Sequence, residues 1–465
     1  MVELAERWGL EAVIPAGITG RVMKTEGLLV VAQGLPVPIG SVVSLERRTG
    51  SPIEGEVIGF DDSRTLVFPL GPVEGLRRGD AVRLRASARR IRVGRELLGR
   101  VVDARGRVID PPGTPFLDDR VAVHKSPPPA TDRPRIDTGL STGVRALDAL
   151  LTCGKGQRLG IFAGSGVGKS VLLGMMARYT AADVNVIALV GERGREVNEF
   201  LQRDLGPDGR ARSTVVVATG DEPAVLRVQA AYTATAIAEY FAARGNDVLF
   251  MMDSVTRFAM AQREIGLAAG EPPTTRGYPP SVYALLPRLV ERAGRTPRGS
   301  ITAFYSVLVE GDDPNEPISD AVRGLLDGHV FLSRELAAAG HYPAIDVLSS
   351  ISRLMNDIAS PEHLEAARQV RRLLAAYRDH ADLISIGAYR SGSNRLVDAA
   401  IALKPDIDAF LQQAVTERAT AEETTARLRS LQAAIERQLG PTPQSSPAAS
   451  SSGGEPTRET RGETA

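Results

Sequence analysis

The feature that most constrains the fold is a glycine-rich loop between a short apolar segment and a helical pattern. Ile161 and Phe162 end the apolar segment, and Val171 opens the helical pattern. The loop reads Ala163-Gly164-Ser165-Gly166-Val167-Gly168-Lys169-Ser170. It follows the phosphate-loop pattern G-x-x-x-x-G-K-[ST], with alanine in place of the first glycine. Such a loop sits between a strand and a helix, which predicts an α/β domain with a parallel sheet.

The residue types of this loop suit the phosphates of ATP. Its glycines let backbone N–H groups turn toward phosphate oxygens, and the N-terminus of the following helix adds partial positive charge. Lys169 is predicted to reach the β- and γ-phosphates, and the Ser170 hydroxyl to ligate Mg²⁺. Only five of the 56 basic residues are lysines, so a lysine at this position is notable. The predicted nucleotide-binding residues of the loop are Gly164, Ser165, Gly166, Val167, Gly168, Lys169, Ser170 and Val171.

Two further apolar segments run into acidic residues. Residues 248–252 lead into Asp253, which is predicted to hold Mg²⁺ through water; the alternative is an aspartate that caps the next turn. Residues 186–190 lead into a segment that contains Glu192. The carboxyl end of a buried strand is where open α/β sheets bind ligands, so Glu192 is predicted to orient the attacking water. Alternatively, the alternating Glu and Arg residues of this segment form a structural salt-bridge cluster.

The composition and the hydrophobic pattern of the chain change along its length. Short runs rich in Val, Ile and Leu alternate with Gly and Pro near the N-terminus, which is typical of a small β-barrel. A repeated strand-turn-helix pattern follows, and then long helical periods that start at Pro361. The predicted division is an N-terminal docking segment at 1–18, a β-barrel at 19–90, a linker at 91–138, a RecA-like nucleotide-binding domain at 139–360, a helical domain at 361–439 and a disordered tail at 440–465.

Composition excludes several other classes of protein. The 465 residues carry 56 basic and 56 acidic side chains, a balance that argues against a nucleic-acid partner. The predicted barrel has only Phe60 and Phe68 as aromatics, too few for stacking on single strands. With Cys153 as the single cysteine, and with neither a signal peptide nor a long apolar span, we expect a cytoplasmic protein.

The chain resembles the hexameric flagellar and type III secretion export ATPases, which are relatives of the rotary ATP synthase catalytic subunits. The resemblance covers roughly residues 15 to 435, and it rests on the segments 160–178, 191–196, 252–270, 271–288 and 308–313. The fourth of these, rich in proline and tyrosine, is more similar to the export branch than to the rotary synthases. Residues 162–180 and 231–241 look more flagellar than virulence-type.

The resemblance implies a ring of six identical chains that hydrolyses ATP to energise export of flagellar proteins. The alternatives are a virulence-type secretion ATPase and a rotary catalytic-type subunit. Glu192 matches the catalytic carboxylate of the family, and Arg193 lies near the γ-phosphate. Arg353 matches an arginine finger supplied to the neighbouring subunit, and Tyr342 matches the aromatic on adenine. From composition alone these last two are a surface charge and a core tyrosine.

The family also implies partners. These are stator and central-stalk proteins of the export apparatus, export cargo with its chaperones, and a membrane export gate at the cytoplasmic face of the inner membrane. In similar proteins the loop 277–286 lines the central pore and grips the stalk; from its residues alone it is equally a rigid turn that leads into a helix.

Overall fold

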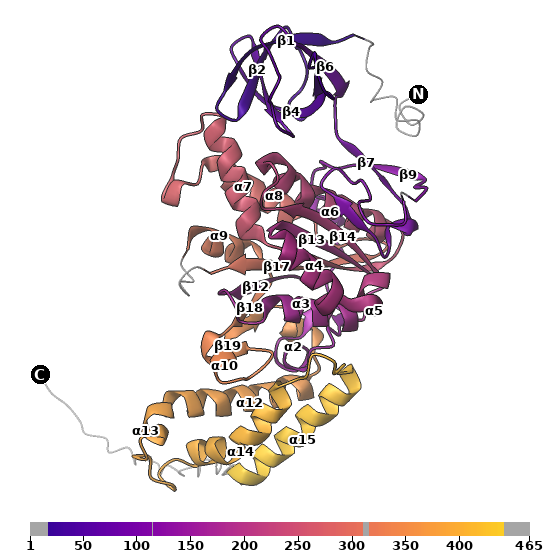
Figure 1. The fold of residues 1–465 in the computed structure, drawn as a ribbon. Helices are drawn as coiled ribbons and strands as arrows, with labels where there is room; N and C mark the ends of the chain where they lie inside the picture. The colour runs from indigo at the N-terminus through magenta and orange to yellow at the C-terminus, as the bar shows by residue number, and fades with distance from the viewer. Residues whose placement is uncertain (1–16, 114, 310–315, 441–465) are drawn as a thin grey trace, which may run out of the picture.

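The computed structural model describes residues 17–113, 115–309 and 316–440, which form three successive units (Figure 1). The predicted N-terminal segment at 1–18 and the predicted tail at 440–465 lie outside these ranges, apart from residues 17, 18 and 440. Within the described part of the chain, no helix is both long and apolar enough to cross a membrane.

The first unit is a closed six-stranded antiparallel barrel, as predicted. Its strand order is β1-β2-β5-β4-β3-β6, and β1 pairs with β6 to close it. Alternation of buried and partly exposed residues along β4 places Val57 inside, where it packs with Val30, Val67 and Val82. The strands are β1 Thr19–Glu26, β2 Leu29–Gln33, β3 Val42–Leu45, β4 Ile53–Asp61, β5 Arg64–Pro69 and β6 Ala81–Ala86.

The second unit is built on a mainly parallel sheet of order β19-β18-β12-β17-β15-β13-β14-β8, which confirms the predicted fold class. All neighbours along this path pair in parallel except β18 and β19. The strands are β8 Val101–Asp103, β12 Arg158–Ala163, β13 Val184–Glu192, β14 Ser213–Thr219, β15 Asp247–Asp253, β17 Ser300–Leu308, β18 Gly328–Leu332 and β19 Ile345–Ser352, and β16 Gly294–Arg295 pairs with β17.

Both faces of this sheet are covered. Val186, Ala188 and Val190 of β13 join a core that includes α6, α7 and α8, whereas Ile187 and Leu189 join a core that includes α3. This pattern explains why β13 reads as a continuous apolar run. The helices are α2 Arg145–Leu150, α3 Lys169–Tyr179, α4 Gly194–Glu199, a π-helical turn Phe200–Leu205, α5 Gly206–Ala211, α6 Ala224–Ala243, α7 Val255–Ala268, α8 Pro280–Val290, α9 Pro317–Leu325, α10 Arg334–Ala338 and α11 Met355–Ile358.

The segment predicted as a linker, 91–138, is part of this unit. Its strand β8 extends the sheet edge, with Val101 opposite Val215 of β14, and β7 Arg90–Val93 pairs with β9 Asp119–Ala122. Sequence patterning missed β8 because three residues carry too little periodicity to stand out among glycines and prolines. The remaining short elements are β10 Gly139–Leu140, β11 Cys153–Gly154 and 3₁₀ turns at Arg95–Leu97, Ala130–Asp132 and Thr275–Gly277.

The third unit is helical, as predicted. The Ser360 hydroxyl accepts a hydrogen bond from the backbone N–H of His363, and Pro361 occupies the first helical turn. Thr420 and Glu423 form a reciprocal capping box at the start of the last helix. The helices are α12 Pro361–Asp379, α13 Ala381–Ser385, α14 Arg395–Leu411 and α15 Ala421–Leu439, and α12, α14 and α15 pack against α2 below the sheet (Figure 1).

Candidate active site

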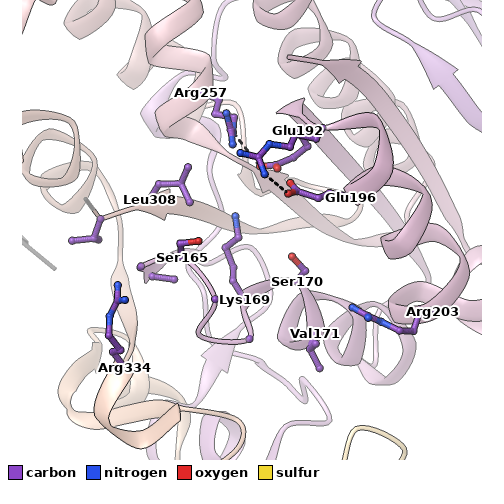
Figure 2. A pocket seen from close by; sticks show the side chains of 16 residues that line it. Ser165, Lys169, Ser170, Val171, Glu192, Glu196, Arg203, Arg257, Leu308 and Arg334 are labelled. Atoms are coloured by element: carbon purple, nitrogen blue, oxygen red, sulfur yellow. Dashed lines mark hydrogen bonds and ion pairs between the residues drawn. The ribbon is translucent and has the colours of Figure 1, made fainter. Parts of the chain in front are cut away.

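The glycine-rich loop connects β12 to α3 and borders a cavity of about 560 Å³ (Figure 2). Gly166 and Gly168 have φ values of +80° and +89°, which residues other than glycine rarely adopt. A Cβ at Gly166 would meet no heavy atom within 4 Å, so the loop leaves open space there. Lys169 and Ser170, the first residues of α3, line the same cavity. The loop therefore has the shape that phosphate binding requires.

Asp253 lies beside the loop because β15 is separated from β12 only by β17. The carboxylate of Asp253, 4% exposed, forms an ion pair with the Lys169 ammonium. Its Oδ1 also accepts a hydrogen bond of 2.6 Å from the Ser306 hydroxyl of β17. The structure thus joins two predicted residues that are 84 positions apart in the sequence. Sequence patterning did not foresee this pairing or the part played by Ser306.

Glu192 ends β13 at the same edge of the sheet and lines the cavity. Burial, and next the negative charge of Asp253, raise the pKa of the Glu192 carboxyl to about 7. Lys169 and Arg257 lower this pKa by their positive charges, and the Nε of Arg257 lies 3.3 Å from Oε1 of Glu192. A carboxyl with a pKa near neutrality is suited to accepting a proton.

Three arginines that sequence patterning missed line the cavity: Arg203, Arg257 and Arg334 (Figure 2). A signal for Arg257 was present. It lies four residues after Asp253, in the first turn of α7, and its backbone N–H donates to the capping hydroxyl of Ser254. A helix that starts at the ligand-binding edge of a sheet presents its first turn to the ligand. No comparable local signal marks the other two.

The predicted residue Arg193 borders the cavity with a largely exposed side chain. Its Nη1 lies 3.3 Å from Oε1 of Glu196, with which it forms an ion pair. Part of the alternating Glu and Arg segment is thus a surface salt bridge, while Glu192 at its start faces the cavity. The salt-bridge interpretation therefore applies to Arg193 and Glu196, and the role of Glu192 toward the attacking water stays a prediction.

Tyr342 lies against the phosphate loop. Its ring atoms Cε1 and Cδ1 are 3.5 and 3.6 Å from the position that a Cβ on Gly168 would take. The side chain is 45% exposed, so it is not a core tyrosine. An exposed aromatic ring beside a phosphate loop offers a flat apolar surface to a nucleotide base.

Arg353 lies at the end of the sheet where the parallel strands begin, whereas the phosphate loop lies at the end where they finish. The reason is topological: β19 runs antiparallel to β18, so its last residues return to the edge where β18 and β12 begin. The backbone N–H of Arg353 donates to the carbonyl of Asp327, just before β18. Its side chain is exposed, and it is not among the residues that line the cavity around the loop.

The chain matches three family models in succession. They are described as the ATP synthase alpha/beta family β-barrel domain (residues 22–84), the nucleotide-binding domain of the same family (143–352) and the T3SS EscN ATPase C-terminal domain (359–430). The flagellum-specific ATP synthase of Bacillus subtilis is 53% identical over 414 residues, which span 89% of this chain and 94% of that protein. The chain belongs to the flagellar and type III secretion ATPases.

Other members of this ATPase family are also similar to the chain in sequence and in structure. The type 3 secretion system ATPase of Xanthomonas euvesicatoria is 50% identical over 88% of this chain and 92% of its own length. The assembled ATPase EscN from the enteropathogenic E. coli type III secretion system matches with a TM-score of 0.84 and 44% identity, over 90% of this chain and 100% of that one. A second structure contains EscN with its central stalk EscO. The predicted family resemblance is confirmed.

Proposed function

We propose that this ATPase hydrolyses ATP in a ring of six copies and thereby energises export of flagellar proteins through a type III secretion apparatus. The observation that carries the proposal is the gathering of three predicted residues beside the phosphate loop. Lys169 and Glu192 line the cavity at the loop. Asp253 forms an ion pair with Lys169 and lines a second cavity, which shares Glu192 and Ser170 with the first. These residues come from three different strand ends, and such an arrangement suits phosphoryl transfer.

The residues at the loop fit a nucleotide bound together with Mg²⁺. Within the described ranges, no group of three or more His, Cys, Asp or Glu side chains could hold a metal ion alone. Mg²⁺ in phosphate sites is commonly held by one or two protein oxygens, with water and phosphate completing its shell. The Ser170 hydroxyl and the Asp253 carboxylate are the oxygens we assign to it. When bound, Mg²⁺ neutralises charge on the phosphates.

The chain's own residues then have separate roles. Lys169 contacts the β- and γ-phosphates, and its ammonium exchanges its contact with Asp253 for contact with phosphate oxygens. Glu192 orients the attacking water and accepts its proton, for which a pKa near 7 is suitable. Arg257 holds the Glu192 carboxylate in place, and Arg193 stabilises charge near the γ-phosphate. The adenine stacks on the ring of Tyr342.

Arg353 acts on the nucleotide of the neighbouring subunit. Its backbone lies at the end of the sheet opposite its own phosphate loop, and its exposed side chain does not line the cavity there, so we assign its guanidinium to the nucleotide of a neighbour. A guanidinium supplied from outside stabilises charge that develops on the transferred phosphoryl group. The relative EscN is an assembled ATPase, which supports a ring in this chain as well.

The remaining partners follow from the relatives. The EscN complex with its central stalk supports a stalk protein as a partner, and residues 277–286 are the segment we assign to it. In the structure this segment is the turn before α8 together with the first part of that helix. Stator proteins, cargo with chaperones, and a peripheral position at the membrane export gate belong to the same proposal. A flagellar role is favoured because the flagellum-specific ATP synthases of Bacillus subtilis and Salmonella typhimurium, at 53% and 51% identity, are slightly more similar to this chain than the secretion ATPase of Xanthomonas euvesicatoria, at 50%.

Replacing Lys169 with alanine should abolish measurable ATP turnover. The substitution removes the ammonium that contacts the phosphates, and loss of one such preorganised group costs about 10²–10³ in rate. Both ATP hydrolysis and binding of a fluorescent ATP analogue should be measured, and both should fall. The control is Lys125→Ala, because Lys125 is half exposed and pairs with Glu239 at the surface. Unchanged turnover in Lys169→Ala would contradict the proposed site.

The same variant separates the flagellar role from the virulence role. In the host cell, Lys169→Ala should stop secretion of flagellar subunits and should stop motility. If secretion of virulence effectors stops while filaments still assemble, the protein serves the virulence branch.

Replacing Arg257 with alanine should move the acid limb of the pH profile of kcat/KM to higher pH. This profile reports the pKa of essential groups in the free enzyme. Burial and the negative charge of Asp253 raise the pKa of Glu192, and the positive charge of Arg257 lowers it. Without Arg257, the pKa of Glu192 therefore rises above about 7. The Glu192 carboxylate then forms only at higher pH. Arg263→Ala in the same helix α7, where Arg263 lies over the ring of Tyr278, should leave the limb in place.

A further inference from the structure

The loop that connects α14 to α15 contains a buried glutamine whose hydrogen bonds extend to the nucleotide site. Gln413 is 4% exposed. Its backbone N–H donates to the carbonyl of Tyr342 over 3.0 Å. Its side-chain Oε1 accepts from the backbone N–H of Arg145 (2.8 Å), and its Nε2 donates to the carbonyls of Gly143 and Glu417, each 2.8 Å away. One residue of the helical domain thus connects the backbone of Tyr342 to the turn before α2.

The surroundings of Gln413 make this connection rigid. Arg145 is 3% exposed, and its Nη1 donates to the carbonyls of Phe410 and Gln412 over 3.0 and 2.9 Å. The same guanidinium forms an ion pair with Glu417. Because these donors and acceptors are buried, each one left without its partner would carry a desolvation cost. The network therefore favours a single position of the loop.

The same loop is also tied to the helix that carries the phosphate-binding lysine. At the end of α3, Nη2 of Arg178 and the hydroxyl of Tyr179 donate to the carbonyl of Val415 over 2.8 and 3.1 Å. Lys169 is the first residue of this helix. The loop after α14 is therefore fixed relative to both the tyrosine and the phosphate-binding segment.

Tyr342 needs such support because its side chain is half exposed and its ring lies beside Gly168 at the surface of the loop. The ring lies 3.5 Å from the Cβ position of Gly168 only while its backbone stays where the Gln413 N–H holds it. A stacking surface contributes to binding in proportion to how well it is placed beforehand. The position of Gln413 therefore determines how much of the stacking energy of a base is realised.

We propose that Gln413 is a positioning residue for the nucleotide base, which lets the helical domain set the affinity for ATP through Tyr342 without acting on the phosphates. The inference rests on the proposed function, since it takes Tyr342 as the base-binding ring. It assigns a part of base recognition to the helical domain, in a residue that touches neither base nor phosphate.

The experiment compares binding of ATP with binding of inorganic tripolyphosphate, which has the phosphates but no base. In Gln413→Met the side chain keeps its length and loses the amide that fixes the loop to Arg145, Gly143 and Glu417. The backbone N–H that bonds Tyr342 is retained, but the loop no longer fixes its position. We expect KM and Kd for ATP to rise about tenfold, the scale of one lost aromatic stack. Tripolyphosphate affinity and kcat at saturating ATP should stay within about twofold of the parent protein, because the phosphate loop is intact.

The matched control is Gln412→Met, the same chemical change one residue earlier on an exposed side chain, and it should alter none of these quantities. Gln413→Glu, which retains the acceptor and the volume and loses the two donated bonds, should shift ATP affinity in the same direction. This second variant keeps the test decisive if Gln413→Met unfolds on heating well before the parent. Equal loss of ATP and tripolyphosphate affinity, or an unchanged KM for ATP, would overturn the inference.

Tyr342→Ala separates this inference from the proposed function. If Tyr342→Ala leaves the ratio of ATP to tripolyphosphate affinity unchanged, the assignment of the base to Tyr342 is wrong. If Tyr342→Ala lowers the ratio and Gln413→Met does not, only the positioning role is wrong. If both roles hold, the double variant should bind ATP no more weakly than Tyr342→Ala alone, because the two changes remove one interaction.

Discussion

Replacing Arg353 with alanine is expected to lower the ATPase rate of the assembled ring by about 10³–10⁵, the range that an arginine finger contributes. Binding of ATP to each subunit should stay unchanged, because Arg353 lies at the sheet edge opposite the phosphate loop of its own chain. The measurements are ATP turnover by assembled protein and analogue binding by dispersed protein.

Mixed rings make this prediction sharper. Arg353→Ala and Lys169→Ala subunits should each be inactive alone. When they are mixed, a site that takes Lys169 from one subunit and Arg353 from its neighbour is complete, so part of the activity should return. Recovery on mixing cannot occur if Arg353 serves its own chain. Arg368→Ala is the control, because Arg368 is an exposed arginine of α12 that pairs with Glu365 three residues away. Full turnover in Arg353→Ala would show that the finger is assigned to the wrong residue.

Replacing Glu192 with glutamine is expected to lower kcat by about 10²–10⁴, the usual contribution of a general base. Glutamine has nearly the same size as glutamate, so the end of β13 should keep its packing and ATP should still bind. It has no carboxylate to accept the proton of the attacking water. The acid limb near pH 7 that the raised pKa of Glu192 predicts should disappear from the residual activity.

The control for Glu192 is Glu199→Gln on the same segment. Glu199 pairs with Arg195 at the surface of α4, at a distance of 3.4 Å, and is 45% exposed at its side chain. An exposed pair of this kind contributes little, so both kcat and the pH limb should be retained. A variant Glu192→Gln that keeps the acid limb would assign that limb to another group.

Much of the candidate site could be predicted because its parts are local. Loop, lysine and serine follow one another from 163 to 170, and Glu192 and Asp253 each follow an apolar run. The strand β8 could not be predicted in this way, since it exists only by pairing with β14. The assignments of Arg353 and Tyr342 came from family resemblance, because nothing in their immediate neighbours distinguishes them from other arginines and tyrosines.

By itself, the sequence determined the phosphate loop, the acidic strand ends, the barrel pattern and the helical domain, because each depends on residues adjacent along the chain. Only the tertiary structure decided the strand order that brings Asp253 to Lys169, places Arg257 beside Glu192 and carries Arg353 to the far edge of the sheet. It alone also joined Gln413 to Tyr342. Contacts between distant segments depend on which elements pack together, and the spacing of residues along the chain does not encode that choice locally.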